Sequence, residues 1–169
     1  MLVVEGALSK VAPNATAPTI SFEQSDYQAS SANLDDPVVI SIQVGELLVR
    51  KVLLDPGSSA DVLFLSNFKK MKLSEKYIQP SAGELAGFSG KRVPVISYIW
   101  LKTTLGEPPL SKTKDIQYLI VECTSPYNII LGRPSLNSFD AIISTIHLCV
   151  KFHVQDNQVA TIHFDLKEA

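Results

Sequence analysis

The stretch that decides the fold reads VLLDPGSSADVLFL and covers residues 52–65. It places one acidic residue, Asp55, between two hydrophobic runs, residues 52–54 and 62–65. Short hydrophobic runs bounded by turn residues are typical of buried strands, and Pro, Gly and Ser are typical of tight turns. A carboxylate at the end of a buried strand is well placed to act on a substrate, because its surroundings can shift its proton affinity. Asp55 is therefore the leading candidate for a catalytic residue, although the same residues could simply form a turn between two strands.

The sequence before this acid predicts a β-hairpin. Residues 38–44 are β-branched and partly alternating, residues 45–46 suit a turn, and residues 47–54 resume an extended pattern. After the second hydrophobic run, residues 66–71 carry hydrophobic side chains at helical spacing, and Ser66 could cap a short helix there. The hairpin would deliver Asp55 to the loop that follows it.

The rest of the chain consists mainly of predicted strands. Residues 84–88 and 93–96 form two extended arms around the tip Ser89-Gly90-Lys91, which predicts a mobile hairpin. Further strands are expected at residues 97–105, 116–123, 141–144, 147–152 and 159–164, with a short helix at residues 135–139. Strands and helices do not alternate, so the sequence predicts an all-β barrel or sandwich with one or two short helices.

Length and composition indicate one core. With 169 residues, of which 46% are hydrophobic, the chain can bury a single core. Residues 9–33 are rich in Ser, Ala, Pro, Asn and Thr and contain few hydrophobic anchors. Such a segment gains too little from burial to offset the entropy lost on ordering. We therefore expect a flexible N-terminal arm over residues 1–33 and one domain over residues 34–169.

Composition also argues against several classes of partner. The 15 basic and 17 acidic residues give a net charge of -2, so the positive surface that binds nucleic acid is not expected. No run of about 18 apolar residues is present, and the opening run of residues 1–4 is too short for a signal peptide. We therefore expect an intracellular, cytoplasmic protein without a membrane partner. Because His147, His153 and His163 lack zinc-site spacing and no phosphate-binding glycine loop is present, no metal or cofactor is expected.

A second motif, at residues 127–136, reads YNIILGRPSL and runs hydrophobic residues into a glycine. Two other motifs precede it, DPGSSAD at residues 55–61 and GFSG at residues 87–90. In this order and at this spacing, the three motifs resemble the retropepsin-like aspartic protease domain of plant gypsy-type LTR retrotransposon polyproteins. The resemblance extends over residues 34–164 and includes a terminal-strand motif at residues 147–152.

This resemblance implies a small closed barrel and a homodimer in which each chain supplies one catalytic Asp. Two carboxyl groups about 3 Å apart cannot both ionise, so one holds a proton while the other acts as a base on a shared water. A single Asp55 per chain therefore requires a second chain. The implied activity is that of an aspartic endopeptidase that cuts a polypeptide, the element polyprotein, at apolar sites.

The resemblance also assigns roles around Asp55. Gly57 would let the substrate backbone approach, and Ser58 would lie on the substrate side of the loop. The catalytic loop would comprise Pro56, Gly57, Ser58 and Ser59, and the flap that closes over the peptide would comprise Gly87, Phe88, Ser89, Gly90 and Lys91.

Residues of the second motif would support that loop. Ile130, Leu131 and Gly132 are expected to pack against it. Arg133 could pair with Asp61 as a brace, or it could remain a solvated surface side chain.

Pro56 departs from the pattern of the resembled family, whose active members usually carry Thr or Ser after the Asp. That hydroxyl bonds across the dyad, whereas proline has neither a hydroxyl nor an N–H. Proline could instead hold Asp55 in place by its rigidity. The alternative to an enzyme is therefore a catalytically inactive relic of this fold or a domesticated peptide-binding or dimerisation module. Ubiquitin-receptor proteins share the fold, but no segment of this sequence resembles ubiquitin.

Overall fold

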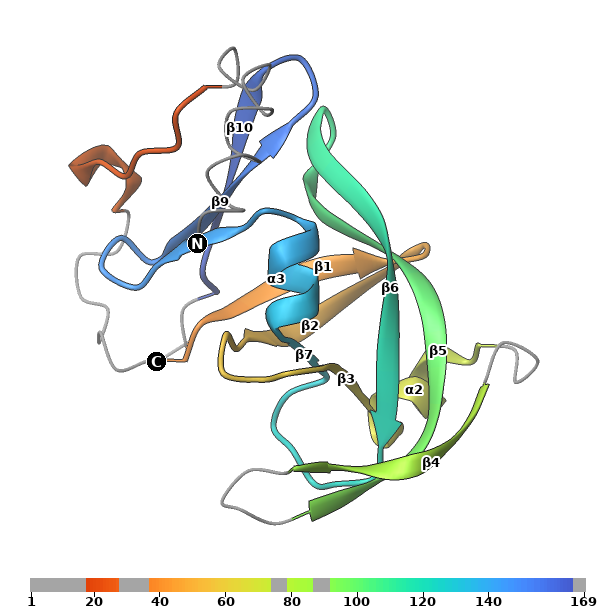
Figure 1. Cartoon of the computed structure of the whole chain (residues 1–169). Helices are drawn as coiled ribbons and strands as arrows, with labels where there is room; N and C mark the ends of the chain where they lie inside the picture. Colours follow the sequence, from red (N-terminus) through yellow and green to blue (C-terminus); the bar gives the residue numbers. More distant parts are fainter. Residues whose placement is uncertain (1–17, 28–36, 74–78, 87–91, 166–169) are drawn as a thin grey trace, which may run out of the picture.

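The computed structural model describes residues 18–27, 37–73, 79–86 and 92–165. Strands dominate these residues, which confirms the predicted all-β class with two short α-helices (Figure 1). In chain order the elements are the 3-10 helix η2 (Gln24–Asp26), β1 (Val39–Val44), β2 (Leu47–Leu54), β3 (Asp61–Phe64), α2 (Leu65–Met71), β4 (Gln79–Ala86), β5 (Arg92–Glu107), β6 (Leu110–Val121), β7 (Ile129–Leu131), α3 (Arg133–Ser138), β8 (Ile142–Ser144), β9 (Cys149–Val154) and β10 (Gln158–His163).

The larger sheet closes into a barrel. Its strands lie in the order β1-β2-β7-β3-β6-β5-β4, and an additional pairing joins β1 to β5. The closing contacts are Gln43 with Thr104 and Val44 with Thr103, in an antiparallel arrangement. Closure leaves β4 as an extension outside the ring, paired only with β5 among the described strands. The predicted hairpin that leads to Asp55 is formed by β1 and β2.

The short strand β7 inserts between β2 and β3, although it follows them by more than sixty residues. It runs parallel to β2, with Leu54 opposite Leu131, and antiparallel to β3, with Val62 opposite Ile130. Because Asp55 follows β2 directly and Gly132 follows β7 directly, this insertion brings the two sequence motifs to the same end of the barrel.

Two hydrophobic clusters lie on opposite faces of these strands. Val52 and Leu54 belong to the main core, whereas Leu53 packs against a smaller cluster that contains Val62 and Ile130. This is the alternation expected of a strand, whose successive side chains point to opposite faces. The two faces of the strand that carries Asp55 are therefore both covered by hydrophobic side chains.

The second sheet has the order β10-β9-β8 and packs one face onto the barrel. Val150, Phe152 and Val154 of β9 belong to the main core. Residues 18–27 contact the second sheet through Lys151, His153 and His163. These contacts attach part of the predicted N-terminal arm to the sheet, while the division of the chain at residue 33 stays a prediction.

Some expected element boundaries were wrong. Ser66 does not cap α2, because the helix begins at Leu65 and its N-cap is Phe64. Phe64 is buried and pairs with Val121, so strand pairing continues up to the first residue of the helix. The strand expected from residue 147 begins instead at Cys149, because Leu148 has a left-handed backbone conformation with φ of 58°.

Candidate active site

Asp55 lies immediately after β2, where the backbone leaves the sheet. Its N–H donates to the carbonyl oxygen of Leu131 at 2.9 Å, which continues the pairing of β2 with β7 by one residue. Its side chain is half-buried, and Oδ1 accepts a hydrogen bond from the Gly57 N–H at 2.9 Å. The carboxylate is therefore fixed relative to its own loop but still reaches solvent.

The loop begins with a β-turn over residues 55–58. The Ser58 N–H donates to the Asp55 carbonyl at 3.0 Å, so Pro56 and Gly57 occupy the two central positions. Proline is favoured at the first central position because its φ is fixed near the required value, and no turn hydrogen bond needs its missing N–H. Pro56 thus suits the local backbone, whatever its effect on chemistry.

Gly57 leaves little room beside the carboxylate. A Cβ atom at this position would lie 3.1 Å from Asp55 Oδ1. Any side chain there would press on the carboxylate oxygen that the Gly57 N–H holds. Gly57 is itself exposed, as are Pro56 and Ser59, so the outer edge of the turn is open to a ligand.

The far side of the loop rests on the turn after β7. The Arg133 N–H donates to the Ser58 carbonyl at 2.9 Å. A Cβ atom on Gly132 would lie 2.4 Å from the Ala60 oxygen and 2.6 Å from the Ser58 oxygen, closer than any side chain allows. The structure therefore brings Leu131 and Gly132, two of the three residues predicted to support the loop, into direct contact with it.

Ser58 uses its hydroxyl within the loop. Ser58 Oγ donates to the Ala60 carbonyl at 2.7 Å, and the side chain is half-buried. The hydroxyl thus stabilises the bend between the turn and β3. The predicted place of Ser58 on the substrate side stays a prediction.

The expected Asp61–Arg133 brace is not formed between these two described residues. Asp61 is only 3% exposed, and its Oδ1 accepts the Gly132 N–H at 2.8 Å. Burial raises the pKa of the Asp61 carboxyl, while the hydrogen bond from the Gly132 amide works in the opposite direction. The Arg133 side chain is exposed, in agreement with the alternative interpretation of this residue. Asp61 therefore binds the second motif through a backbone amide and not through the Arg133 side chain.

Sequence reasoning missed this amide because a backbone donor leaves no mark in the sequence. The available signal was the position of Asp61 at the head of a hydrophobic run, which places it in a strand buried on both faces. A carboxylate in such a strand must find a donor nearby.

The predicted flap lies outside the described residues, since residues 87–91 are not among them. The two strands on either side of it are described and pair as expected. Leu85 lies opposite Val93 and Ala86 opposite Arg92, in the antiparallel pair of β4 and β5. The arms of the predicted hairpin are therefore confirmed.

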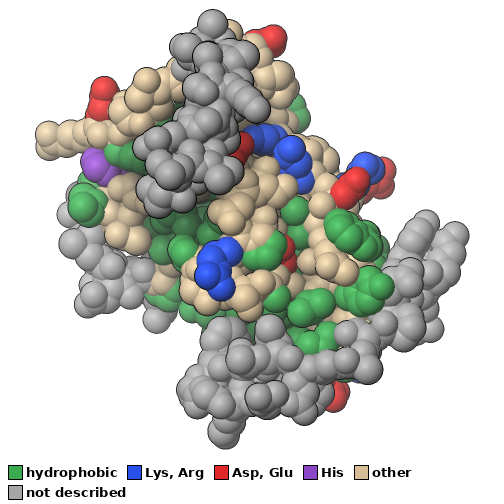
Figure 2. All heavy atoms as spheres, in the orientation of Figure 1, with side chains coloured by type: hydrophobic (Ala, Val, Ile, Leu, Met, Phe, Trp, Pro, Cys, Tyr) green, Lys and Arg blue, Asp and Glu red, His purple; other side chains and the backbone are tan. Residues whose placement is uncertain are grey.

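A groove of about 420 Å³ lies beside the end of the loop at Ser59 and Ala60. Ser59, Ala60 and Asp61 form one wall, α3 contributes Pro134 and Ser138, and β5 and β6 contribute Trp100, Asp115, Ile116, Gln117 and Leu119. On the face shown in Figure 2, hydrophobic side chains gather over β5 and β6. Asp55 does not line this groove, so the groove is distinct from the surface around the candidate catalytic acid.

The described residues offer no group of three or more His, Cys, Asp or Glu side chains that could hold a metal ion. In the same part of the chain, no helix is long and apolar enough to cross a membrane.

Comparison with known proteins identifies the fold. No family model matches the chain, and no curated protein matches it in sequence. The retroviral protease-like domain of Ddi1 from Leishmania major superposes with a TM-score of 0.56 at 13% identity, covering 76% of this chain and 93% of that domain. EIAV protease, solved with the inhibitor HBY-793, gives a TM-score of 0.48 at 19% identity and covers 68% of this chain and 98% of its own. A retropepsin-like aspartic protease from Rickettsia conorii gives a TM-score of 0.45 at 16% identity, and the match covers 63% of this chain and 75% of that chain. The likeness to the Leishmania domain shows that the barrel has the retropepsin-like fold.

Proposed function

We propose that this protein is an aspartic endopeptidase that works as a homodimer, with one Asp55 from each chain. One observation carries the proposal: within a retropepsin-like barrel, Asp55 stands at the head of a turn whose own amide holds its carboxylate and whose far side rests on Gly132. Such a turn presents an acid at a fixed position without enclosing it.

A second chain is required by the chemistry. Activating water and protonating a leaving amine takes one ionised and one protonated carboxyl group, and this loop supplies a single one. In the dimer the ionised Asp55 would take a proton from water as the water attacks the peptide carbonyl. Asp55 of the second copy would donate a hydrogen bond to that carbonyl and then transfer its proton to the leaving amine. The two apparent pKa values would belong to the pair.

The substrate class we propose is a polypeptide bound at apolar residues. Leu53 and Tyr127 are half-buried and pack against the smaller hydrophobic cluster, on the face of β2 opposite the main core. Hydrophobic side chains of a bound peptide would find matching walls there. The motif order and spacing of the sequence further support an origin in a retrotransposon polyprotein, which would itself be the substrate.

Pro56 favours a second candidate function, a module of this fold that binds peptides or dimerises without cleaving. The residue has no hydroxyl with which to bond across a dyad. Against this, the turn hydrogen bond from Ser58 and the Gly57 N–H already fix Asp55 without any contribution from residue 56. Rigidity of the turn would then replace the missing bond.

The test uses a mixed peptide library incubated with the full chain from about pH 3.5 to 7, after sedimentation has established the dimer. Asp55→Asn, which keeps the size of the side chain, is the matched control. Cleavage by the wild type that is lost in Asp55→Asn supports the enzyme. Cleavage that survives Asp55→Asn contradicts the proposal. A folded dimer that binds peptides without cutting them at any of these pH values also contradicts it and favours the second candidate.

A further inference from the structure

The groove of about 420 Å³ beside the end of the catalytic loop takes no part in the proposed catalysis. Its walls come from three parts of the fold: the end of the loop at Ser59 and Ala60, the helix α3, and the antiparallel pair of β5 and β6. Three walls around one hollow form a site that a side chain can enter from solvent. The chemistry of these walls and their place relative to Asp55 decide what the groove could bind.

The largest side chain in the groove is Trp100 of β5, which is open to solvent. It is 56% exposed and lies opposite Gln117 of β6 in the antiparallel register. Ile96, on the same strand, is 44% exposed. A tryptophan offers a large apolar ring together with an indole N–H, and this residue type is enriched among those that contribute most to binding. Trp100 therefore gives the groove an apolar wall suited to a ligand.

Leu119 connects the groove to the surface proposed to bind substrate. It is half-buried, it lines the groove, and it also packs against the smaller hydrophobic cluster. Leu53 and Tyr127, which we proposed as walls for an apolar peptide, pack against the same cluster. Because Leu119 belongs to both groups, apolar side chains continue from the proposed substrate walls into the groove.

The backbone path from Asp55 to the groove is short. The Ser58 N–H donates to the Asp55 carbonyl at 3.0 Å, and such a turn keeps its two end Cα atoms within about 7 Å. One further residue adds about 3.8 Å, so the Cα of Ser59 lies within about 11 Å of that of Asp55. An extended peptide covers about 11 Å in three to four residues. A substrate residue about three to five positions from the scissile bond would therefore reach the groove.

The walls of the groove are held in place by contacts within the fold. Ser58 Oγ donates to the Ala60 carbonyl at 2.7 Å, and a Cβ atom on Gly132 would lie only 2.4 Å from the Ala60 oxygen. At the other wall, Lys112 Nζ of β6 donates to the Phe139 carbonyl at 3.1 Å and ties the end of α3 to the barrel. A groove that is formed before its ligand arrives costs little to organise on binding.

The rim of the groove is polar and selects weakly for charge. Ser59, Gln117 and Ser138 are exposed, and their hydroxyl and amide groups can bond a peptide backbone. Asp115 pairs with Lys102 at 3.2 Å, and the two side chains are 64% and 73% exposed. Exposed pairs of this kind contribute little, so the apolar wall dominates recognition. A peptide with a bulky apolar side chain fits this combination of apolar wall and neutral polar rim.

We propose that the groove extends the substrate cleft and takes a bulky apolar side chain of the polypeptide substrate, about three to five residues from the scissile bond. The inference rests on the proposed function and adds to it a second point of recognition. Trp100 and Leu119 would contact the apolar side chain, while Ser59 and Gln117 would bond the peptide backbone beside it. Affinity for a substrate would then depend on its length and on a residue remote from the bond that is cut.

Binding of synthetic peptides to the full chain carrying Asp55→Asn tests the inference apart from cleavage. Every peptide contains the apolar core Leu-Phe, and the two members of a pair differ at one position three to five residues from that core, which is Phe in one and Ala in the other. The Phe peptide should bind about tenfold more tightly. Because Trp100 is the single tryptophan of the chain, its emission should shift to shorter wavelength with the Phe peptide as water leaves the ring.

Two variants change opposite walls of the groove. Trp100→Ala removes the apolar wall, and Ser138→Gln narrows the groove from α3 at an exposed position. Each should reduce the advantage of the Phe peptide to less than about threefold. If Trp100→Ala does not fold, Ser138→Gln alone decides. Leu48→Ala is the matched control and should keep the full advantage, because Leu48 is 64% exposed on β2 and does not line the groove.

Equal binding of the two peptides, binding of neither, or an advantage that survives the groove variants overturns the inference. Cleavage of the same peptides by the wild type separates this inference from the proposed function. If the wild type cuts both peptides with equal kcat/KM, the endopeptidase is supported and the role of the groove is overturned. If the Phe peptide binds more tightly but neither peptide is cut, the role of the groove is supported and the endopeptidase is overturned.

Discussion

Replacing Gly132 by alanine tests how the candidate catalytic loop is supported. The backbone of Gly132 has φ of -93°, which alanine adopts freely, so the change adds a methyl group without straining the backbone. That methyl group would start 2.4 Å from the Ala60 oxygen and 2.6 Å from the Ser58 oxygen. To reach ordinary contact, the loop must move by about 1 Å.

The expected loss of stability follows from two contributions. Overpacking of this kind costs about 1 to 3 kcal/mol. Moving the loop also loosens the bond from the Gly132 N–H to the buried Asp61 carboxylate, and hydrogen bonds to charged groups contribute about 1.5 to 3 kcal/mol. We expect Gly132→Ala to lower the free energy of unfolding by about 3 kcal/mol or more. A 1 Å displacement of Asp55 would also lower cleavage about 100-fold.

Urea unfolding followed by the fluorescence of the single tryptophan, Trp100, measures the loss in free energy of unfolding. Gly45→Ala is the matched control, because Gly45 has φ of +58° and no atom within 4 Å of a new Cβ. It carries the backbone cost of a left-handed alanine, about 1 to 2 kcal/mol, without a clash. If Gly132→Ala destabilises the protein less than Gly45→Ala does, the close approach at Gly132 does not support the loop.

Three further predictions concern charges and the catalytic turn. Urea unfolding should show that Asp61→Asn is more stable relative to the wild type at pH 7 than at pH 4. The raised pKa of Asp61 favours folding of the wild type at low pH, and this benefit is lost as pH rises through the folded-state pKa. An equal difference in stability at both pH values would contradict the burial argument. Lys151→Met should expose residues 18–27 to hydrogen exchange at neutral pH. In the wild type, the stability contributed by the Asp26–Lys151 ion pair is present above the ordinary Asp26 pKa of 3.8 and is lost only as pH falls through the lowered folded-state pKa. Unchanged exchange in the variant would show that the ion pair does not hold residues 18–27 on the second sheet. Pro56→Thr should raise kcat by up to about 100-fold with little change in KM if the missing hydroxyl limits alignment of the dyad, and an unchanged kcat would show that the turn already aligns it.

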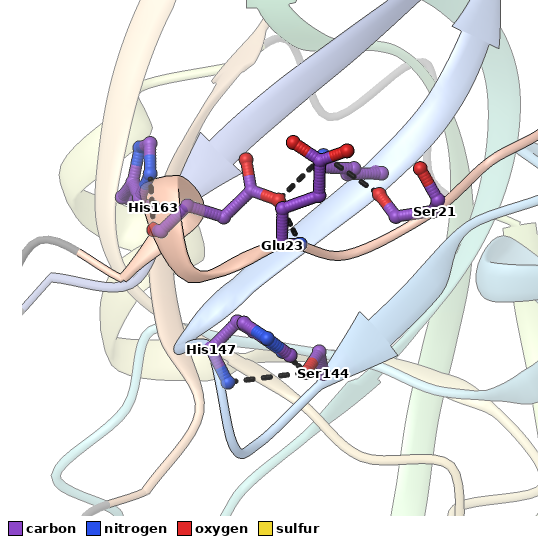
Figure 3. A network of polar contacts seen from close by, with 7 residues as sticks. Ser21, Glu23, Ser144, His147 and His163 are labelled. Carbon is purple, nitrogen blue, oxygen red and sulfur yellow. Dashed lines mark hydrogen bonds and ion pairs between the residues drawn. The ribbon is translucent and has the colours of Figure 1, made fainter.

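Local patterns were enough to predict much of the fold. The β-branched run before Gly45 and the extended run after it predict the hairpin of β1 and β2, because both depend on neighbours in sequence. Closure of the barrel depends on Val44 meeting Thr103, and nothing in either local sequence specifies that pairing. The contacts of residues 18–27 with the second sheet (Figure 3) were not predicted, for a related reason. Composition averages over a segment, whereas a few anchors such as Phe22 and Asp26 suffice to attach it.

In the candidate site, too, the features set by neighbours in sequence could be predicted and those set by distant contacts could not. Asp55 and the glycine after β7 could be identified because turn residues at strand ends are visible in the sequence. The partner of Asp61 could not, because formal charges suggested Arg133 while the structure uses the amide of the residue before it. Sequence shows which charges are present, but only the backbone path shows which donor lies nearest.

The insertion of β7 between β2 and β3 has a consequence for the order in which the chain matures. During synthesis, residues 55–61 leave the ribosome well before residues 129–133, and a pairing this distant in sequence forms late in folding. Until then, Asp55 has no Leu131 carbonyl to bond, and Ser58 has no Arg133 amide. A nascent or prematurely terminated chain would therefore carry Asp55 in an unsupported loop. The proposed catalytic site would be complete only after residues 129–133 have been synthesised and have paired with that loop.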